Sequence, residues 1–275
     1  MALQAVINQT RKPDKIVIFD DNDQQEDLRQ DPVFCNFFWM MQAKDIAWEW
    51  VFAEKKGQHH NHQKANWMGF DWVWRVDDDA LPEPEVLENL LVHIAPDVGA
   101  VGGSVLTPPN FWEDANPTGK IEMINHEPNP QWQRIKAKKE VDHLHCSFLY
   151  RAGVYDYNLG LSRVAHREET LFTWGIKQKG FKLLIVPDAV TWHLKAPSGG
   201  IRMDAKDEMF AHDEQIFLNT MAHKDKTVVV LDNGMGDHIV FKHVLPDIKN
   251  PVVFGCYPEI IPCRSIAEAR HLFGG

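Results

Sequence analysis

The sequence lacks any long apolar run. None of its 275 residues belongs to a stretch approaching the roughly 18 consecutive apolar residues that a membrane-spanning helix needs, and no signal-peptide pattern is present. Cysteine is also scarce: the chain has 4, widely spaced and without a Cys-x-x-Cys pair. This spacing excludes a dense disulfide scaffold and favours a reduced protein. Together these absences predict a soluble, cytoplasmic protein without a transmembrane segment.

Basic residues are outnumbered. The chain has 29 lysines and arginines against 39 acidic residues, a formal net charge of −10. This balance argues against broad, nonspecific binding of nucleic acid, although a local basic stretch at residues 134–139 leaves a smaller basic surface open. The length and the 44% hydrophobic content fit one large domain, or one domain with a small appendage.

Three consecutive acids follow a short apolar run at residues 72–76. Asp77, Asp78 and Asp79 come directly after this expected buried strand, and two prolines and a helical pattern follow them. Adjacent carboxylates repel one another, and the repulsion is relieved most easily by a cation between them. Oxygen ligands of this kind suit Mg²⁺ or Mn²⁺, whose other ligands are commonly water and phosphate. A solvated acidic turn without a metal is the alternative.

The order of apolar patterns predicts an α/β fold. A second short strand ends at acids as well, with residues 15–19 leading into Asp20 and Asp21. Two strands of this kind indicate an open sheet with helices on both faces and ligands at the carboxyl ends of the strands. We expect helices at residues 1–10, 45–55, 85–94 and 167–179, and further strands at residues 99–106, 144–150 and 182–186.

The C-terminal region changes in character. Residues 227–231 form a β-branched strand, followed by a glycine-containing turn, a helix to residue 244, a strand at 251–255 and a helix at 265–273. We therefore predict two units, residues 1–225 and a small βαβα unit at residues 226–275. The glycines either place a phosphate at a helix N-terminus or only permit a tight turn, and the sequence leaves both open.

Five stretches, in the correct order, resemble the family 2 glycosyltransferases, which have the nucleotide-sugar-binding GT-A fold. Residues 3–21 resemble the first helix and second strand of that family, and residues 57–66 resemble its loop and helix before the metal strand. Residues 76–79 resemble its Asp-x-Asp motif, and residues 167–193 its Glu-Asp helix, glycine stop and late histidine. The resemblance covers residues 1 to about 195.

The resemblance implies a role for each matching residue. It implies metal binding by Asp77, Asp79 and His193, and it places Glu169 as the general base with Glu168 beside it to orient the acceptor or support the metal region. The donor-binding positions are Asp20 and Asp21 for the base (usually uracil), Lys64 and Asn66 near the donor, and Asp78 between the metal acids. The implied activity is metal-dependent, inverting transfer of a hexose from a nucleotide-sugar donor, expected to be UDP-linked, with Mn²⁺ or Mg²⁺ as cofactor.

The sequence departs from that family in three ways. The first strand of the family has no counterpart, because the chain begins in the following helix; the expectation is a truncated GT-A domain. Glu169 stands where the family has aspartate, which is one methylene shorter. The C-terminal unit resembles the opening of a GT-B, heptosyltransferase-like domain.

Two other functions fit the same residues. A nucleotidyltransferase also places acids at strand ends for Mg²⁺, and a sugar-nucleotide-binding module that has lost catalysis would keep the same motifs. The acceptor stays open among a glycan, a lipid-linked glycan, a protein and a nucleic-acid base, since the sequence contains no signal for any one of them.

Overall fold

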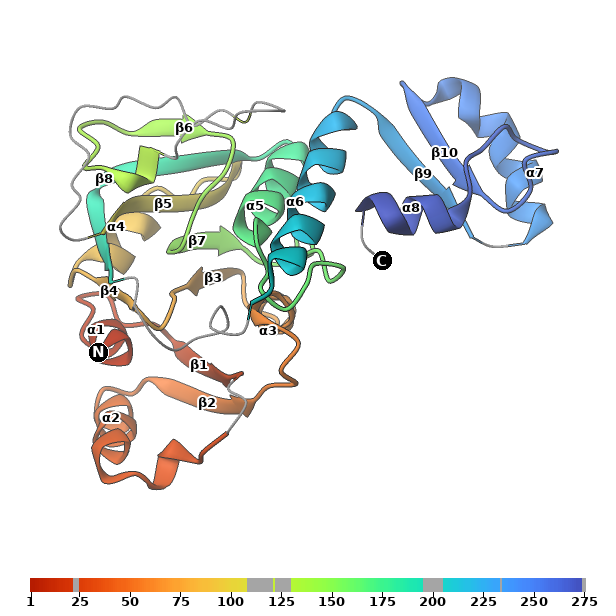
Figure 1. The fold of residues 1–275 in the computed structure, drawn as a ribbon. Helices are drawn as coiled ribbons and strands as arrows, with labels where there is room; N and C mark the ends of the chain where they lie inside the picture. The colour runs from red at the N-terminus through yellow and green to blue at the C-terminus, as the bar shows by residue number, and fades with distance from the viewer. Residues whose placement is uncertain (22–24, 108–120, 122–129, 195–204, 233, 274–275) are drawn as a thin grey trace.

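The computed structural model describes residues 1–21, 25–107, 121, 130–194, 205–232 and 234–273 (Figure 1). Their largest feature is a six-stranded mixed sheet in the order β3-β7-β5-β8-β4, with β6 paired to β8. The expected α/β sheet with helices on both faces is confirmed. Its strands are β3 (Trp72–Arg75), β4 (Ala80–Pro82), β5 (Val98–Leu106), β6 (Lys139–Val141), β7 (Phe148–Arg151) and β8 (Lys182–His193).

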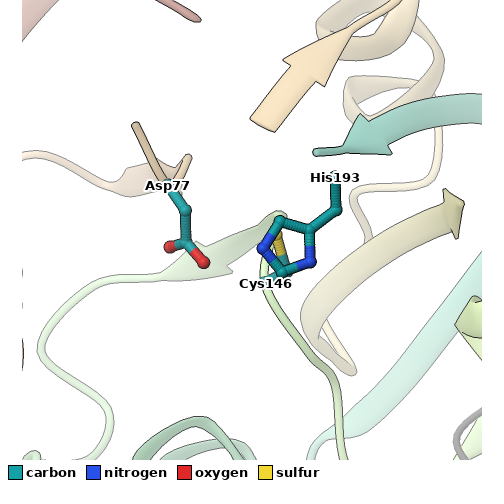
Figure 2. Close-up of side chains that lie close together, drawn as sticks. All are labelled: Asp77, Cys146 and His193. Carbon is teal, nitrogen blue, oxygen red and sulfur yellow. The ribbon is translucent and has the colours of Figure 1, made fainter. Parts of the chain in front are cut away.

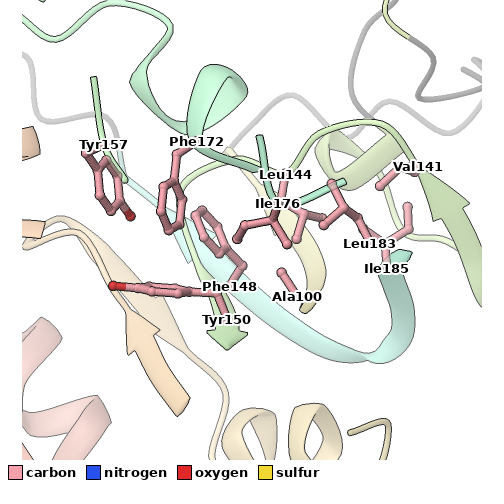
Figure 3. Packing of buried hydrophobic residues seen from close by; sticks show 10 residues of the cluster. All are labelled: Ala100, Val141, Leu144, Phe148, Tyr150, Tyr157, Phe172, Ile176, Leu183 and Ile185. Atoms are coloured by element: carbon pink, nitrogen blue, oxygen red, sulfur yellow. The ribbon is translucent and has the colours of Figure 1, made fainter. Parts of the chain in front are cut away.

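The two faces of the sheet follow the alternation of side chains along each strand. On β7, Phe148 and Tyr150 pack toward α5 (Glu168–Gln178), whereas Leu149 between them packs toward α4 (Val86–Leu91). Figure 3 shows the first of these clusters, in which side chains from β5, β7 and β8 meet Phe172 and Ile176 of α5. The cluster on the α5 face and the cluster on the α4 face together form the core on both sides of the main sheet.

Helix α6 (Asp207–Ala222) covers the outer side of α5. Ile216, Phe217 and Met221 of α6 pack in one buried cluster with Leu161 and Leu171. None of the helices in the described part of the chain is long and apolar enough to cross a membrane.

Strands β1 (Lys15–Asp20) and β2 (Ala47–Phe52) form a separate, parallel two-stranded sheet. Within the described residues, β1 pairs with β2 alone and β3 pairs with β7 alone. The β1–β2 pair is therefore separate from the main sheet in the described residues. Helix α1 (Ala2–Ile7) docks beside the main sheet, where buried Gln9 bonds the backbone of Glu83 and Leu87.

The helix expected at residues 45–55 is wrong. That segment contains β2, and the helix lies earlier, as α2 (Pro32–Ala43). Asp31 caps α2 by accepting hydrogen bonds from the backbone N–H groups of Val33 and Phe34, with Pro32 at the first helical position. The aromatic and β-branched residues at 48–52, interrupted by Glu49 alone, are the strand signal that the helical interpretation missed.

Two strand boundaries also differ from expectation. The strand expected at residues 144–150 begins only at Phe148, because Cys146 has a left-handed backbone with φ 57°. Conversely, β8 continues through Pro187 to His193 as one strand, with a register shift against β5 between Gly102 and Ser104. The proline is tolerated because it lies where the ladder is interrupted.

The C-terminal region has the expected βαβα order. Strands β9 (Thr227–Leu231) and β10 (Pro251–Gly255) are parallel, with α7 (Met235–Val244) and the short η3 (Leu245–Asp247) between them, followed by α8 (Ile266–Phe273). Helix α8 contacts the main sheet region through two hydrogen bonds, from Asn158 to the carbonyl of Phe273 and from Asn219 to that of Leu272, each 2.9 Å. The short elements left are η1 (Leu28–Gln30), α3 (Gln58–Asn66) and η2 (Pro130–Trp132).

Candidate functional site

The acidic motif lies in the turn between β3 and β4. Asp78 and Asp79 occupy the turn, which closes with a 3.1 Å hydrogen bond from the N–H of Ala80 to the carbonyl of Asp77. Strand β4 then pairs with β8, placing Ala80 opposite His193. This pairing brings His193 Nε2 to 3.2 Å from Asp79 Oδ1. Residues distant in the chain therefore meet because β8 extends beyond Pro187.

Three side chains that could hold a metal ion, Asp77, Cys146 and His193, lie at the same place, and we call them the metal-ligand cluster. One ligand atom each from Asp77, Cys146 and His193 lies within 4.8 Å of the other two, and Figure 2 shows that the three side chains come from separate segments. Among the described residues this group does not include Asp79, which instead contacts His193. Sequence reasoning missed Cys146, because a single cysteine far from the acidic motif has no recognisable spacing.

The acidic turn is electrostatically crowded. Loss of solvation raises the pKa of Asp78, and the charges of Asp79 and Asp77 raise it further. A group of carboxylates in this condition gains from a nearby cation. The repulsion expected among Asp77, Asp78 and Asp79 is therefore present in the structure.

Arg75 is the buried cation beneath this turn. Its Nη2 donates a 3.0 Å hydrogen bond to Asp77 Oδ1, and its Nη1 donates a 2.7 Å bond to Glu168 Oε1. Glu169 Oε1 lies 3.6 Å from the same Nη2. In the sequence, Arg75 lies inside the run at residues 72–76 that predicts a buried apolar strand. A single arginine between apolar residues directly before three acids was the available signal, since a buried charge requires partners.

The start of α5 is fixed from the outside by α6. Asp213, fully buried, accepts hydrogen bonds from Ser162 N, Ser162 Oγ and His166 N. Arg167 then pairs with Glu214, and its left-handed φ of 69° directs the chain into the helix. The position of Glu168 and Glu169 therefore depends on these contacts.

The two neighbouring glutamates have different surroundings, because adjacent helical residues point about 100° apart. Glu168 is 1% exposed and accepts hydrogen bonds from Arg75 and from Gln58, so it lies inside the protein. Burial raises its pKa to about 8 despite the attraction of Arg75. Glu169 retains 13% side-chain exposure, and its Oε1 lies 3.4 Å from Cys146 N, beside the metal-ligand cluster. Of the pair, Glu169 is the one at the site.

His145 is a further residue that the sequence did not reveal. Its Nδ1 lies 3.6 Å from Glu169 Oε1, and its ring packs edge-on against that of His193, with centroids 6.2 Å apart. Burial lowers its pKa, which favours the neutral imidazole. His145 thus connects the glutamate with the metal-ligand cluster.

The predicted base-binding acids lie at the end of β1. Asp20 is the last residue of the strand, and its carbonyl accepts from Ala53 N and from Gln25 Nε2. The carboxylate of Asp21 accepts the backbone N–H groups of Lys55 (2.9 Å) and Gly57 (3.1 Å). Asp21 therefore holds the turn that leads into α3.

The other two predicted donor contacts make structural bonds on α3. Lys64 Nζ lies 2.8 Å from Glu54 Oε1 at the surface. Asn66 is buried, donating to the carbonyl of Tyr155 and accepting from Gly153 N. These contacts join α3 to its neighbours, and none of them is with the metal-ligand cluster.

Two surface pockets lie elsewhere. One, of about 460 Å³, is bordered by α6, α8 and β9, and the other, of about 650 Å³, by residues 154–160 and the adjoining helices. Neither is lined by the acidic turn, Glu169 or His193. The candidate site is identified by its chemistry.

Solved glycosyltransferase structures share this fold. The structure of GalNAc-T7 with UDP, GalNAc and Mn²⁺ superposes with a TM-score of 0.58 and 14% identity over 82% of this chain and 46% of that one. The structure of S. aureus TarS 1–349 with UDP-GlcNAc superposes with a TM-score of 0.54 and 14% identity, over 81% of this chain and 64% of that one. The likeness shows the GT-A fold for this chain.

The chain spans less than two thirds of the length of either structure. No protein-family model matches the sequence, and no curated protein matches it.

Proposed function

We propose that this chain is a nucleotide-sugar-dependent glycosyltransferase that moves a sugar from a UDP-linked donor to an acceptor hydroxyl, with inversion at the anomeric carbon. One observation carries the proposal: Asp77, Asp79, His193 and Glu169 gather around the β3–β4 turn. The fold is that of structures containing UDP, GalNAc and Mn²⁺, or UDP-GlcNAc. The family 2 resemblance and the heptosyltransferase-like C-terminal unit remain part of the proposal.

The residues present fit a divalent cation. Ligand atoms of Asp77 and His193 lie within 4.8 Å of each other, and Asp79 Oδ1 lies 3.2 Å from His193 Nε2. In the proposal these three residues hold Mn²⁺ or Mg²⁺. When bound, such an ion would neutralise the diphosphate leaving group as a Lewis acid. Arg75 keeps the carboxylate of Asp77 directed at the site through their 3.0 Å hydrogen bond.

Glu169 takes the role of general base. Its carboxylate is the partly exposed one of the pair on α5, and Arg75 and Cys146 N hold it on the side facing the metal-ligand cluster. Removal of the acceptor proton by one carboxylate, with direct displacement at the sugar, accounts for inversion. Glu168, being buried, supports Arg75 and thereby the position of Glu169; it does not touch the acceptor.

The donor base is assigned to the end of β1. Asp20 and Asp21 are the proposed base-binding residues, and Asp78 the proposed donor contact in the acidic turn. Lys64 and Asn66 contribute indirectly, since their bonds to Glu54 and to the backbone of residues 153–155 fix α3. The four free cysteines fit the cytoplasmic compartment that the sequence suggests.

Donor hydrolysis tests the proposal. The full chain is incubated with UDP-GlcNAc, UDP-GalNAc or UDP-glucose and Mn²⁺, and free UDP is measured. We expect UDP release by the wild type, loss of release in Asp79→Asn, and no loss in Asp71→Asn, which changes an exposed acid just before β3. Equal release by wild type and Asp79→Asn would contradict the assignment.

Two companion measurements separate the alternative functions, a sugar-nucleotide-binding module and a nucleotidyltransferase. Binding of the nucleotide sugar without UDP release indicates a module that has lost catalysis. Release of pyrophosphate from a nucleoside triphosphate and a sugar phosphate indicates a nucleotidyltransferase.

A further inference from the structure

Cys146 presents a sulfur atom to a site that the sequence predicted to contain oxygen and nitrogen ligands alone. Its side chain is fully buried, and its Sγ belongs to the group of three ligand atoms within 4.8 Å of one another. The other two atoms come from Asp77, after β3, and His193, at the end of β8 (Figure 2). The three donors therefore differ in chemistry and come from three separate segments.

The backbone around Cys146 is held in the conformation that directs this sulfur. Three consecutive N–H groups donate to side chains: Leu144 N to Thr173 Oγ1 (3.0 Å), His145 N to Gln131 Oε1 (2.7 Å) and Cys146 N to Glu169 Oε1 (3.4 Å). Cys146 itself has a φ of 57°, which side-chain-bearing residues rarely adopt. These three hydrogen bonds stabilise the backbone of residues 144–146, including the left-handed conformation of Cys146.

The carboxylate of Asp77 is the direct neighbour of the buried Cys146 thiol and shares a hydrogen bond with it. Arg75 acts on the same group electrostatically, while its hydrogen bonds go to the carboxylates of Asp77 and Glu168. A metal ion among sulfur, imidazole and carboxylate would satisfy all three donors at once.

We propose that Cys146 is a protein ligand of the site cation, and that the site therefore prefers Zn²⁺ or Co²⁺ to Mg²⁺. Mg²⁺ favours octahedral oxygen ligands, whereas thiolate and imidazole ligands suit zinc and cobalt. On binding, the thiol proton passes to solvent and the sulfur coordinates as thiolate. The inference concerns the cation of the proposed function and does not require the transfer reaction.

Cobalt spectroscopy provides the direct test. Cys256 and Cys263, which interact in the C-terminal unit, are first replaced by serine so that they do not bind the metal. We expect Co²⁺ to produce a sulfur-to-cobalt charge-transfer band in this background and no such band after the further change Cys146→Ser. Absence of the band in the background protein, or its persistence in Cys146→Ser, would overturn the proposal.

Calorimetric titration with Zn²⁺, Mn²⁺ and Mg²⁺ measures the preference. Cys146→Ser should weaken Zn²⁺ binding by about tenfold or more and change Mn²⁺ binding far less. Cys35→Ser, on α2, is the matched control and should change neither affinity. Equal loss of Zn²⁺ and Mn²⁺ affinity in Cys146→Ser, or tighter Mg²⁺ than Zn²⁺ binding by the wild type, would contradict a sulfur ligand.

X-ray absorption on the zinc complex tests the sulfur ligand without the Cys146→Ser variant, and it therefore serves if that variant does not fold. In the Cys256→Ser/Cys263→Ser background we expect one sulfur neighbour at about 2.3 Å from zinc. A first shell of nitrogen and oxygen alone would overturn the proposal. A zinc–sulfur bond without UDP release would contradict the glycosyltransferase function and support Cys146 as a ligand. UDP release without a zinc–sulfur bond would support the glycosyltransferase function and contradict Cys146 as a ligand.

Discussion

Arg75 Nη1 donates a 2.7 Å hydrogen bond to Glu168 Oε1 in the interior, where the two side chains are 1% and 0% exposed. The bond joins the end of β3 to the first turn of α5. Because the same guanidinium also bonds Asp77, one buried cation couples the acidic turn to the helix that carries Glu169. Arg75 therefore sets the spacing between Asp77, a proposed metal ligand, and Glu169, the proposed base.

Arg75→Met should strongly destabilise the protein. The substitution keeps an unbranched apolar chain of similar reach but leaves Glu168 buried with a hydrogen bond from Gln58 and without its cation. Each hydrogen bond to a charged group that is lost costs roughly 1.5–3 kcal/mol, and Arg75 donates to both Asp77 and Glu168. Glu168, whose pKa is already about 8, takes up a proton when the guanidinium is gone, which limits the loss. The free energy of unfolding from urea titration measures the loss.

A matched surface pair and a double variant complete this test. Lys15 and Glu49 lie 2.6 Å apart but are 26% and 43% exposed, so Lys15→Met should cost less than about 1 kcal/mol. Arg75→Met/Glu168→Gln should be more stable than the sum of its single changes by about 1–3 kcal/mol, because the unpaired carboxylate is gone. Strict additivity would show that the two residues do not act as a pair.

His59 should make stability depend on pH. It is fully buried at the start of α3, and burial lowers its pKa from 6.5 to about 4, with the charge of His60 as a smaller cause. Between those values the unfolded chain binds a proton that the folded chain excludes, so stability falls as the pH drops from 6.5 to 4. A shift of this size corresponds to at most about 3 kcal/mol.

His59→Leu removes that proton. The two ring nitrogens are buried, and the one interaction that favours the protonated ring is with the backbone of Leu161, so leucine removes the titration at the cost of a single weak contact. Urea titrations at pH 7.5 and pH 5 should show a smaller loss of stability on acidification for His59→Leu than for the wild type, with exposed His271→Leu as the control. An unchanged pH dependence in His59→Leu would rule out this histidine as the cause.

Gly103 and Gly236 should respond in opposite directions to alanine. A Cβ on Gly103 would lie 1.8 Å from the carbonyl oxygen of Ala189, at the register shift between β5 and β8. A Cβ on Gly236, in α7, meets nothing within 4 Å. We expect Gly103→Ala to destabilise by several kcal/mol or prevent folding, and Gly236→Ala to stabilise by roughly 0.5 kcal/mol through helix propensity. Similar melting temperatures for the two variants would contradict the close approach of β5 and β8.

Local patterns predicted much of this fold. The apolar run before Asp77, the strand before Asp20 and the glycine that ends α5 are short-range signals, and the structure has the expected elements at each. The helix expected at residues 45–55 is a strand, because aromatic and β-branched residues such as Trp48, Trp50 and Val51 favour extended backbone. The Asp31-Pro32 cap was the stronger local signal, and it marks the real helix.

The contacts within the candidate site could not be predicted from local sequence patterns. That Asp79 meets His193 follows from the antiparallel pairing of β4 with β8, which depends on β8 continuing past a proline. Cys146 reaches the cluster through one left-handed residue, and Arg75 meets Glu168 through the docking of α5 on the sheet. Long-range contacts of this kind leave no spacing rule in the chain.

Glu169→Gln tests the proposed base. Glutamine keeps the shape and the contact with Cys146 N but does not accept a proton at neutral pH, so UDP release should fall by roughly 10²–10⁴. Glu140→Gln, an exposed change on β6, should leave the rate unchanged.

Two further measurements separate catalysis from folding and metal binding. The urea midpoint and the Mn²⁺ affinity of Glu169→Gln should stay close to wild type, because Glu169 is not among the three clustered ligand atoms. Glu169→Asp should retain more activity than Glu169→Gln, since a shorter carboxylate still accepts the proton. If Glu169→Gln keeps most of the turnover while Glu169→Asp loses it, the carboxylate positions its neighbours and another group removes the proton. His145, 3.6 Å from Glu169, would then be the first residue to test.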